Sequence, residues 1–252
     1  MCLSERVHPF DLPEFEPEAA LELGLPRIQA FLRRHGGMPS SSPPPLLVLG
    51  GRAPKPDWLR KVSVGRKIWA LDRGADACRA AGVVPSRILG DFDSVSDGAR
   101  EWAERMGAKT DRYTPDKDDT DFQLALRLLS GDVVVTGCWG GRFDHAFSNV
   151  FSSLWAMERG VRVLWFADER EVLFPLRGPA KLELDFEIPP SALSLLSLTA
   201  SCEGVSIENV KWPLDEADLA QGSPREISNV PLGRPVRVEV RSGVLGVYGE
   251  CR

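Results

Sequence analysis

Apolar residues occur in short continuous runs from residue 46 onward, and stretches with helical periodicity separate these runs. A run such as 133–135 does not alternate with polar positions, which is typical of a strand buried on both faces. Such strands, separated by helices, predict a mostly parallel sheet with helices on each side. We expect strands at 46–49, 67–71, 87–89, 132–136 and 161–166, and helices at 57–62, 74–81, 97–106, 119–129 and 144–159.

The pattern changes after about residue 172, where helical periodicity fades and short strands separated by turn residues follow. Residues Arg241, Ser242 and Gly243 predict a hairpin turn between the last two strands. We expect this part to form an all-β sandwich. Its strands are predicted at 181–186, 192–198, 202–210, 236–240 and 244–248.

The first 44 residues differ from both of these parts. Residues 19–34 have a helical apolar pattern interrupted at Pro26, and residues 40–45 form a Ser/Pro run that cannot continue a helix. We expect residues 1–44 to be an appendage and linker, either a small helical cap or a partly ordered tail. The predicted fold class is therefore α/β, with a doubly wound sheet at 45–172 and a C-terminal β-sandwich at 173–252.

The composition excludes several classes of protein. A hydrophobic content of 43% and a charged content of 27% are those of an ordinary globular protein. The net charge of −5 argues against a general nucleic-acid binder, which needs a basic surface, and the apolar runs are too short to span a membrane. Five cysteines without a CxxC pair indicate free thiols, so we expect a cytoplasmic location.

Two aspartates follow the predicted strand at 87–89. Asp91 and Asp93 lie at i and i+2 of an extended segment and therefore point to the same side. Their carboxylate oxygens suit Mg²⁺, which leaves its other positions to water and phosphate. The alternative is a solvated loop in which Asp93 caps the next helix.

A second acidic cluster lies at residues 116–121, where four aspartates and Lys117 lead into a predicted helix. Favourable interaction with the helix dipole would explain some of these acids. Four of them exceed that need, and their repulsion is costly unless a cation relieves it. Lys117 can meet a phosphate oxygen as a point charge. We interpret the two clusters together as a divalent-metal polyphosphate site.

The third cluster is the glycine pair Gly140–Gly141 followed by Arg142, Asp144 and His145. Glycines allow backbone N–H groups to approach a ligand closely, and a helix N-terminus favours an anion. We interpret His145 as a capping or core histidine and not as a metal ligand. Because the other predicted parallel strands also end in Gly or Asp, we expect the ligand at the carboxyl edge of the sheet.

These segments, taken in order, resemble the motif series of the thiamine pyrophosphokinase family. The resemblance rests on residues 90–94 (GDFDS), 116–121 (DKDDTD) and 140–145 (GGRFDH) and continues through residues 204–214, 222–223 and 227–229 to about residue 248. It implies an ATP-binding catalytic domain at 45–172, a thiamine-binding sandwich at 173–252 and a homodimer with active sites between subunits. Residues 1–44 have no counterpart, and Pro224, Arg225 and Glu226 stand where smaller residues are usual.

The resemblance also implies a reaction and a set of roles. The terminal diphosphate of ATP would be transferred to the hydroxyl of thiamine with release of AMP, and Mg²⁺ would be required. The family motifs assign metal binding to Asp91, Asp93 and Asp121, phosphate contact to Lys117 and Thr120, and thiamine contact to Asp144, Ser228 and Asn229. From their places at the strand ends, Gly51, Asp72, Gly141 and Arg142 are expected to join the nucleotide site.

In-line transfer of a diphosphate needs mainly orientation and neutralised charge, so the acids must act together with a metal. A carboxylate near the hydroxyl, either Asp118 or Asp72, is expected to accept the proton. Three alternatives stay open: a related diphosphokinase for a pterin-like hydroxymethyl heterocycle, a metal-dependent phosphohydrolase, and a nucleotide sensor without turnover. We expect neither nucleic acid nor a membrane as a partner.

Overall fold

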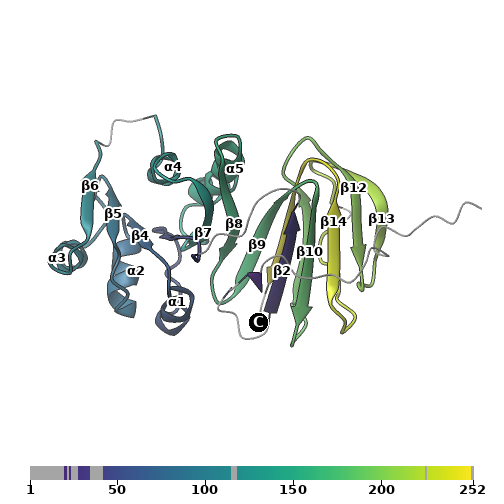
Figure 1. Cartoon of the computed structure of the whole chain (residues 1–252), viewed down its shortest axis with the longest axis horizontal. Coiled ribbons are helices and arrows are strands. Elements are labelled where there is room, and N and C mark those ends of the chain that lie inside the picture. Colours follow the sequence, from purple (N-terminus) through teal and green to yellow (C-terminus); the bar gives the residue numbers. More distant parts are fainter. Residues whose placement is uncertain are drawn as a thin grey trace, which may run out of the picture.

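The computed structural model of the chain describes residues 20, 21, 23, 28–34, 42–114, 118–224 and 226–250, and its strands form two sheets. In Figure 1 the helices surround the parallel part of the larger sheet on the left, and the stacked β-strands lie on the right. The larger sheet has the order β11 (Ala192–Ser197), β15 (Val244–Glu250), β9 (Glu171–Arg177), β8 (Val161–Ala167), β7 (Gly131–Thr136), β3 (Leu46–Val48), β4 (Ile68–Leu71), β5 (Arg87–Gly90) and β6 (Lys109–Arg112). The smaller sheet has the order β1 (Ala20–Leu21), β2 (Ile28–Arg34), β10 (Ala180–Phe186), β14 (Val236–Val240), β12 (Ser201–Glu208) and β13 (Leu214–Ala220).

Strands β8 to β6 of the larger sheet run parallel, and all five strands expected there are present. The five expected helices also form, as α1 (Pro56–Val62), α2 (Gly74–Ala81), α3 (Asp97–Arg105), α4 (Asp121–Arg127) and α5 (Phe143–Met157). Strand β6 was not predicted, because its Lys-Thr-Asp-Arg sequence has no apolar run. It lies at the edge of the sheet, where charged side chains are common.

Helices cover both faces of the parallel strands. Leu46 and Val48 of β3 pack in one core with α1, α2 and α3, whereas Leu47 packs in a second core with α4 and α5. Successive side chains of a strand point to opposite faces, so a run with no polar position fits a sheet covered on both sides. The predicted doubly wound arrangement is confirmed.

The larger sheet continues without a break into the β-rich half. Strand β9 pairs antiparallel with β8, and β15 and β11 follow. The six-stranded sheet packs into the same core as α1–α3, so it covers the same face of the larger sheet farther along. The boundary expected at residue 172 falls inside β9, which Pro175 concealed from the sequence pattern because proline is unusual in a central strand.

The helical pattern expected over residues 19–34 is wrong, because Ala20–Leu21 and Ile28–Arg34 are strands. Ile28, Ala30 and Leu32 are buried while Gln29 is exposed, which is the period of a strand. Strand β2 pairs with β10 over its whole length. Part of the expected appendage therefore completes the six-stranded sheet.

The hairpin expected at Arg241, Ser242 and Gly243 is also wrong. Strand β14 lies in the six-stranded sheet and β15 in the nine-stranded sheet, so the turn passes from one sheet to the other. Gly243 has a φ of +86°, and a Cβ there would lie 2.4 Å from the carbonyl oxygen of Ser201. The three residues do form a turn, but the strands with which β14 and β15 pair are set by residues far away in the sequence.

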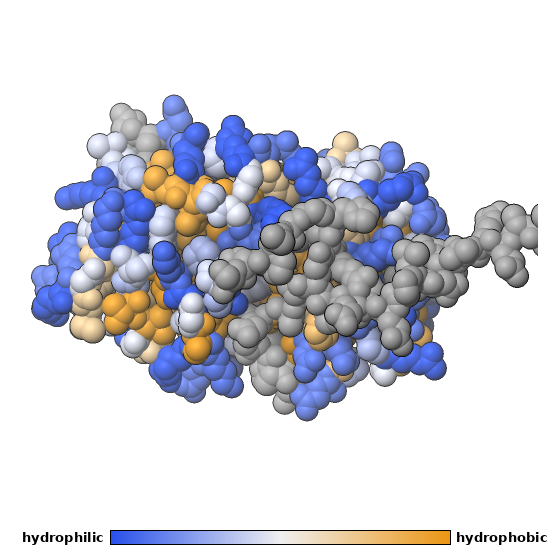
Figure 2. All heavy atoms as spheres, in the orientation of Figure 1, coloured by the Kyte–Doolittle hydropathy of each residue, from blue (hydrophilic) through white to orange (hydrophobic). Residues whose placement is uncertain are grey.

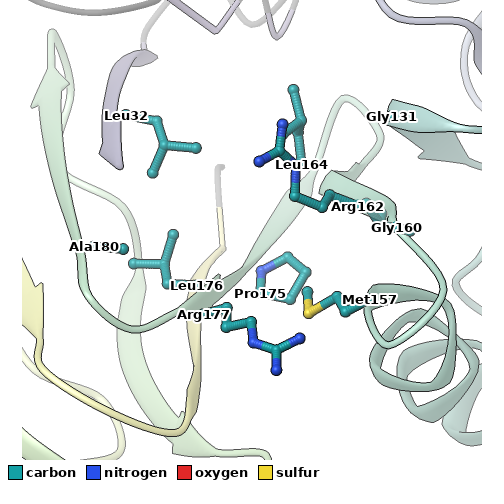
Figure 3. Close-up of a pocket in the computed structure, with 11 residues that line it drawn as sticks. Leu32, Gly131, Met157, Gly160, Arg162, Leu164, Pro175, Leu176, Arg177 and Ala180 are labelled. Atoms are coloured by element: carbon teal, nitrogen blue, oxygen red, sulfur yellow. The ribbon is translucent and has the colours of Figure 1, made fainter. Parts of the chain in front are cut away.

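A cavity of about 200 Å³ lies where β2 faces β8 and β9, at the end of the sheet opposite the strand ends with the acidic clusters. Figure 3 shows Leu32, Leu164 and Leu176 around it, with Arg162 and Arg177 nearby. Both arginines are paired, with Asp132 at 2.7 Å and Glu158 at 2.9 Å respectively.

The surface is mixed on the face shown in Figure 2, where apolar residues emerge in separate areas over the α/β half, among hydrophilic ones. Within the described residues, no helix is long and apolar enough to cross a membrane. The described cysteines Cys78, Cys138 and Cys202 are buried free thiols.

Candidate active site

A cavity of about 590 Å³ opens at the carboxyl ends of the parallel strands β3, β4, β5 and β7. It brings together segments that are far apart in the sequence, as expected for a sheet of this kind. The predicted site residues that line it are Gly51, Asp72, Asp91, Asp93, Thr120, Asp121, Gly141 and Arg142. Asp118, Asp144, Ser228 and Asn229 are described by the structure but are not part of this lining, and Lys117 lies outside the described residues.

Two loops form one wall of the cavity by direct contact between their backbones. The N–H of Gly51 donates to the carbonyl oxygen of Gly137 at 2.8 Å. A Cβ at Gly51 would lie 2.6 Å from the carbonyl oxygens of both Gly137 and Trp139. The position therefore admits only glycine, and the loops after β3 and β7 fit together there without side chains between them.

Three carboxylates, those of Asp72, Asp91 and Asp121, converge in the same cavity. Asp72 shares a hydrogen bond with Asp121, and the charge of Asp91 repels an ionised Asp72. Gly90, with a φ of +153°, makes this possible, because a Cβ there would lie 1.8 Å from Oδ1 of Asp72. Asp72 and Phe92 also have positive φ values, 46° and 65°, and such costly conformations cluster at functional sites.

The environment of these carboxylates disfavours their full ionisation without a counter-charge. Burial raises the pKa of Asp72 to about 8, with further increases from the hydrogen bond to Asp121 and from the charges of Asp121 and Asp91. Across the described residues, no group of three or more His, Cys, Asp or Glu side chains is arranged to hold a metal ion unaided. Mg²⁺ commonly uses only one or two protein carboxylates together with waters and substrate phosphates. The carboxylate set therefore fits a Mg²⁺ ion that a nucleotide shares.

Asp93 lies at the cavity and does not cap the following helix. It is exposed, and its N–H donates to Oδ1 of Asp91 at 3.1 Å. The N-cap of α3 is Ser96, whose side chain accepts from the N–H of Ala99 at 3.2 Å. The alternative in which Asp93 is only a helix cap is thus wrong.

The described residues of the second acidic cluster differ in their contacts. Thr120 is the N-cap of α4 in a capping box with Gln123, so this hydroxyl already accepts one hydrogen bond. Asp119 is bound by both Nε and Nη2 of Arg127, at 2.8 and 3.1 Å. Asp121 remains turned to the cavity, whereas Asp118 is exposed outside its lining.

The start of α5 presents several polar side chains near the glycine pair. Arg142 forms a two-pronged ion pair with Asp144, with distances of 3.1 and 2.5 Å. This pairing with Arg142 lowers the pKa of Asp144. Both side chains are more than half exposed, at 74% and 60%. His145 is also exposed and lines the cavity, and the N-cap of α5 is Arg142 without a side-chain cap bond, so the interpretation of His145 as a capping or core histidine is wrong.

The predicted thiamine residues of the β-rich half lie in a different setting. Asn229 is buried, and its Oδ1 accepts from the N–H groups of Trp212 and Val230 at 3.1 and 2.9 Å. Its Nδ2 donates to the carbonyl oxygen of Trp212 at 2.7 Å. Ser228 is exposed with a φ of +63°, and its N–H donates to Oγ of Ser194 at 3.0 Å. This segment therefore holds Trp212, which is itself 52% exposed.

Besides His145, sequence reasoning missed four polar residues that line the cavity. Arg73, Ser94 and Cys138 follow predicted strand ends, so the rule that ligands bind at carboxyl ends would have found them. Asn149 lies one helical turn after His145 and shares its face of α5. Burial raises the pKa of the Cys138 thiol well above its usual value, which keeps that group neutral.

Comparison with known proteins matches two domains in the order in which they occur here. The family described as "Thiamin pyrophosphokinase, catalytic domain" matches residues 62–165, and "Thiamin pyrophosphokinase, vitamin B1 binding domain" matches residues 181–245. Thiamine pyrophosphokinase of Bacillus subtilis is 24% identical over 64% of this chain and 77% of its own length. Thiamine pyrophosphokinase 1 of Oryza sativa is 22% identical, with 64% of each chain covered.

Solved structures agree with these matches at the level of the fold. The crystal structure of the Bacillus subtilis thiamine pyrophosphokinase has a TM-score of 0.72 at 20% identity, covering 83% of this chain and all of its own. The thiamin pyrophosphokinase of Candida albicans has a TM-score of 0.68 at 16% identity, covering 81% of this chain and 89% of its own. Since both domain descriptions of one family match in order, over residues 62–165 and 181–245, and the fold is shared, the chain belongs to the thiamin pyrophosphokinase family.

Proposed function

We propose that the protein transfers the diphosphate group of ATP to the hydroxyl of thiamine, which gives thiamine diphosphate and AMP. The observation that carries this proposal is the convergence of Asp72, Asp91 and Asp121 with two glycine-rich loops in a single cavity. Backbone N–H groups and a shared cation suit a polyphosphate, and the match to a vitamin B1 binding domain supports thiamine as the acceptor.

The reaction requires an in-line arrangement more than covalent help from the protein. The hydroxyl oxygen of thiamine bonds to the β-phosphorus of ATP. The bond from that phosphorus to the oxygen that bridges the α- and β-phosphates breaks, and AMP leaves with this oxygen. Of the two candidate proton acceptors, Asp72 lines the cavity and Asp118 does not, so Asp72 is the better placed. Lys117, Thr120 and Arg142 are assigned to the phosphates.

Mg²⁺ supplies charge neutralisation on the transferring group when it is bound. The proposed ligands are the carboxylates of Asp91, Asp93 and Asp121, one or two of which would hold the ion together with waters and substrate phosphates. The position of Asp72 beside Asp121 adds a fourth carboxylate to this group. These side chains orient the nucleotide, while the neutral Cys138 thiol and the backbone of the two loops close the other side.

We also infer a two-fold symmetric dimer with its active sites between subunits. Asp144, Ser228 and Asn229 lie outside the cavity lining of a single chain. Large apolar side chains are exposed near these residues in the sequence, among them Phe143 at 80% and Leu232 at 61%. Such surfaces mark interaction sites. Light scattering at micromolar concentration should give twice the chain mass, and a monomer mass would contradict the inference.

An assay of the purified protein with ATP, Mg²⁺ and thiamine tests the reaction by following AMP and thiamine diphosphate. The two products should form in equal amounts, and neither should form without thiamine. AMP released without thiamine would instead indicate a phosphohydrolase. ATP bound with no turnover would indicate a sensor, and turnover only with a pterin-like alcohol would identify a different diphosphokinase.

A further inference from the structure

A buried ion network lies beside the cavity, and its centre is Arg52, the residue after Gly51. Nε of Arg52 donates to Oδ2 of Asp168 at 2.9 Å, and Nη2 donates to the same oxygen at 2.5 Å and also to Glu171. The Asp168 side chain is only 1% exposed, and that of Arg52 is 29% exposed. A carboxylate buried to this degree is strongly destabilising without its cation, so the guanidinium has one well-defined place.

The remaining polar atoms of the network connect it to the β-rich half. Oδ1 of Asp168 accepts from the N–H groups of Arg170 and Glu171 at 2.8 and 3.1 Å. Oη of Tyr248, on β15, donates to Oε2 of Glu171 at 2.9 Å. The network therefore joins the loop after β3 to the turn after β8 and to two antiparallel strands of the same sheet.

The backbone of Arg52 belongs to the wall of the cavity at the same time. Its N–H donates to the carbonyl oxygen of Trp139 at 2.5 Å, beside the bond from Gly51 to Gly137. Gly50, Gly51, Gly140 and Gly141 of these two loops line the cavity, whereas Arg52, Asp168 and Glu171 do not. The side chain of Arg52 thus fixes the backbone that lines the cavity, although the side chain itself does not line it.

We propose that Arg52 is a positioning residue for the nucleotide. Through Asp168 and Glu171 it holds the two glycine-rich loops in register, so that the backbone at Gly140 and Gly141, which lines the cavity, meets the phosphates of ATP. This inference rests on the proposed function, since it takes ATP as the occupant of the cavity. Arg52 has no contact with the reacting atoms, and its effect is expected on ATP binding and not on thiamine binding.

The test variant is Arg52→Lys, which keeps a positive charge beside Asp168 but loses the planar two-pronged contact. The matched control is Arg162→Lys. Arg162 lies at the other end of β8, is bound to Asp132 at 2.7 Å and does not line the large cavity. For each protein the dissociation constant of ATP is measured by calorimetry, together with the KM values for ATP and thiamine and the melting temperature.

Arg52→Lys should raise the dissociation constant and KM for ATP about tenfold, because small displacements of a positioned site have large effects. The KM for thiamine should be nearly unchanged, and the control should alter neither constant. Equal increases of both KM values, or a lower melting temperature with unchanged ATP affinity, would be the behaviour of a structural ion pair and would overturn the proposal.

A second variant, Glu171→Gln, removes the charge and keeps one oxygen acceptor where Glu171 offers one to Arg52 and one to Tyr248, and it decides the matter if Arg52→Lys does not fold. An unchanged ATP affinity in Glu171→Gln would then overturn the proposal. The calorimetric measurement does not need turnover. A parent protein that binds ATP but forms no thiamine diphosphate contradicts the proposed function alone, whereas a parent that binds no ATP overturns both.

Discussion

The two regions predicted to bind substrates differ in what their polar side chains do within the chain. At the carboxyl ends of the parallel strands, Asp72, Asp91 and Asp121 crowd together, and the pKa of Asp72 rises to about 8. In the β-rich half, the side-chain amide of Asn229 makes three hydrogen bonds with the backbone of Trp212 and Val230. In the first region the carboxylates ionise fully only when a cation offsets their burial and repulsion, whereas in the second region the polar groups bond within the chain and present a neighbouring side chain.

The largest effect should come from removing one charge of the first region. Asp91→Asn should lower turnover by at least about two orders of magnitude, the loss expected when charge stabilisation of a transition state is removed. The fold should survive, because removing the charge of Asp91 lowers the repulsion among the carboxylates, and this offsets the weakened hydrogen bonds of that side chain. The measurement is the rate of thiamine diphosphate formation together with a thermal melt. Asp97→Asn, an exposed first-turn aspartate of α3, is the control, and equal activity of the two variants would contradict the proposed role of Asp91 in metal binding.

The next variant tests whether turnover needs the close placement of the Asp72 carboxylate beside Asp91 and Asp121. Gly90→Ala would place a Cβ 1.8 Å from Oδ1 of Asp72, so the carboxylate must move. Turnover should fall by more than about tenfold, since a misplaced group costs much of the benefit of orientation. Gly82→Ala is the control, because Gly82 also has a positive φ of 66° but no atom lies within 4 Å of its added Cβ. If both variants lose only stability and keep their turnover, the placement of Asp72 is irrelevant to the chemistry.

The same contrast explains what the sequence could predict. The parallel strands and their helices follow from local periodicity, and the strand-end rule then predicts Gly51, Asp72 and Asp91 at one edge, where all three line the cavity. Ile28–Arg34 was misjudged because a short apolar pattern fits a helix as well as a strand, and only its pairing with β10 decides between them. The bond from Arg52 to Asp168 joins residues 116 positions apart. Local pattern contains no information on such a contact.

A smaller effect is expected in the second region, where Asn229 acts through Trp212. Asn229→Ala removes three hydrogen bonds and should lower the free energy of unfolding by about 1–3 kcal/mol, the usual cost of unsatisfied buried polar groups. The freed Trp212 segment should raise the KM for thiamine more than about tenfold, while the KM for ATP stays constant. Steady-state kinetics with each substrate varied in turn, and a denaturant titration, measure these changes. An increase in the KM for ATP instead would show that the β-rich half also shapes the nucleotide site.

Asp144 lies between the two regions and gives the finest test of the division. It is exposed, paired with Arg142 and outside the cavity lining, so within one chain it has no ligand role that geometry requires. If it meets the aminopyrimidine of thiamine, Asp144→Asn should raise the KM for thiamine about tenfold through one lost charged hydrogen bond and leave the KM for ATP nearly unchanged.

The competing explanation for Asp144 is that it only stabilises the start of α5 as an acidic residue of the first turn. The control is Asp57→Asn, because Asp57 occupies the first turn of α1 and is likewise paired with a nearby arginine, Arg60. A purely structural role predicts the same small change in melting temperature for both variants and no change in kinetics. A role in thiamine binding predicts that only Asp144→Asn alters the KM for thiamine. If the KM for ATP rises instead, Asp144 belongs to the carboxylate and nucleotide region. Its role would then be to hold Arg142, which without this pairing contacts the phosphates less well.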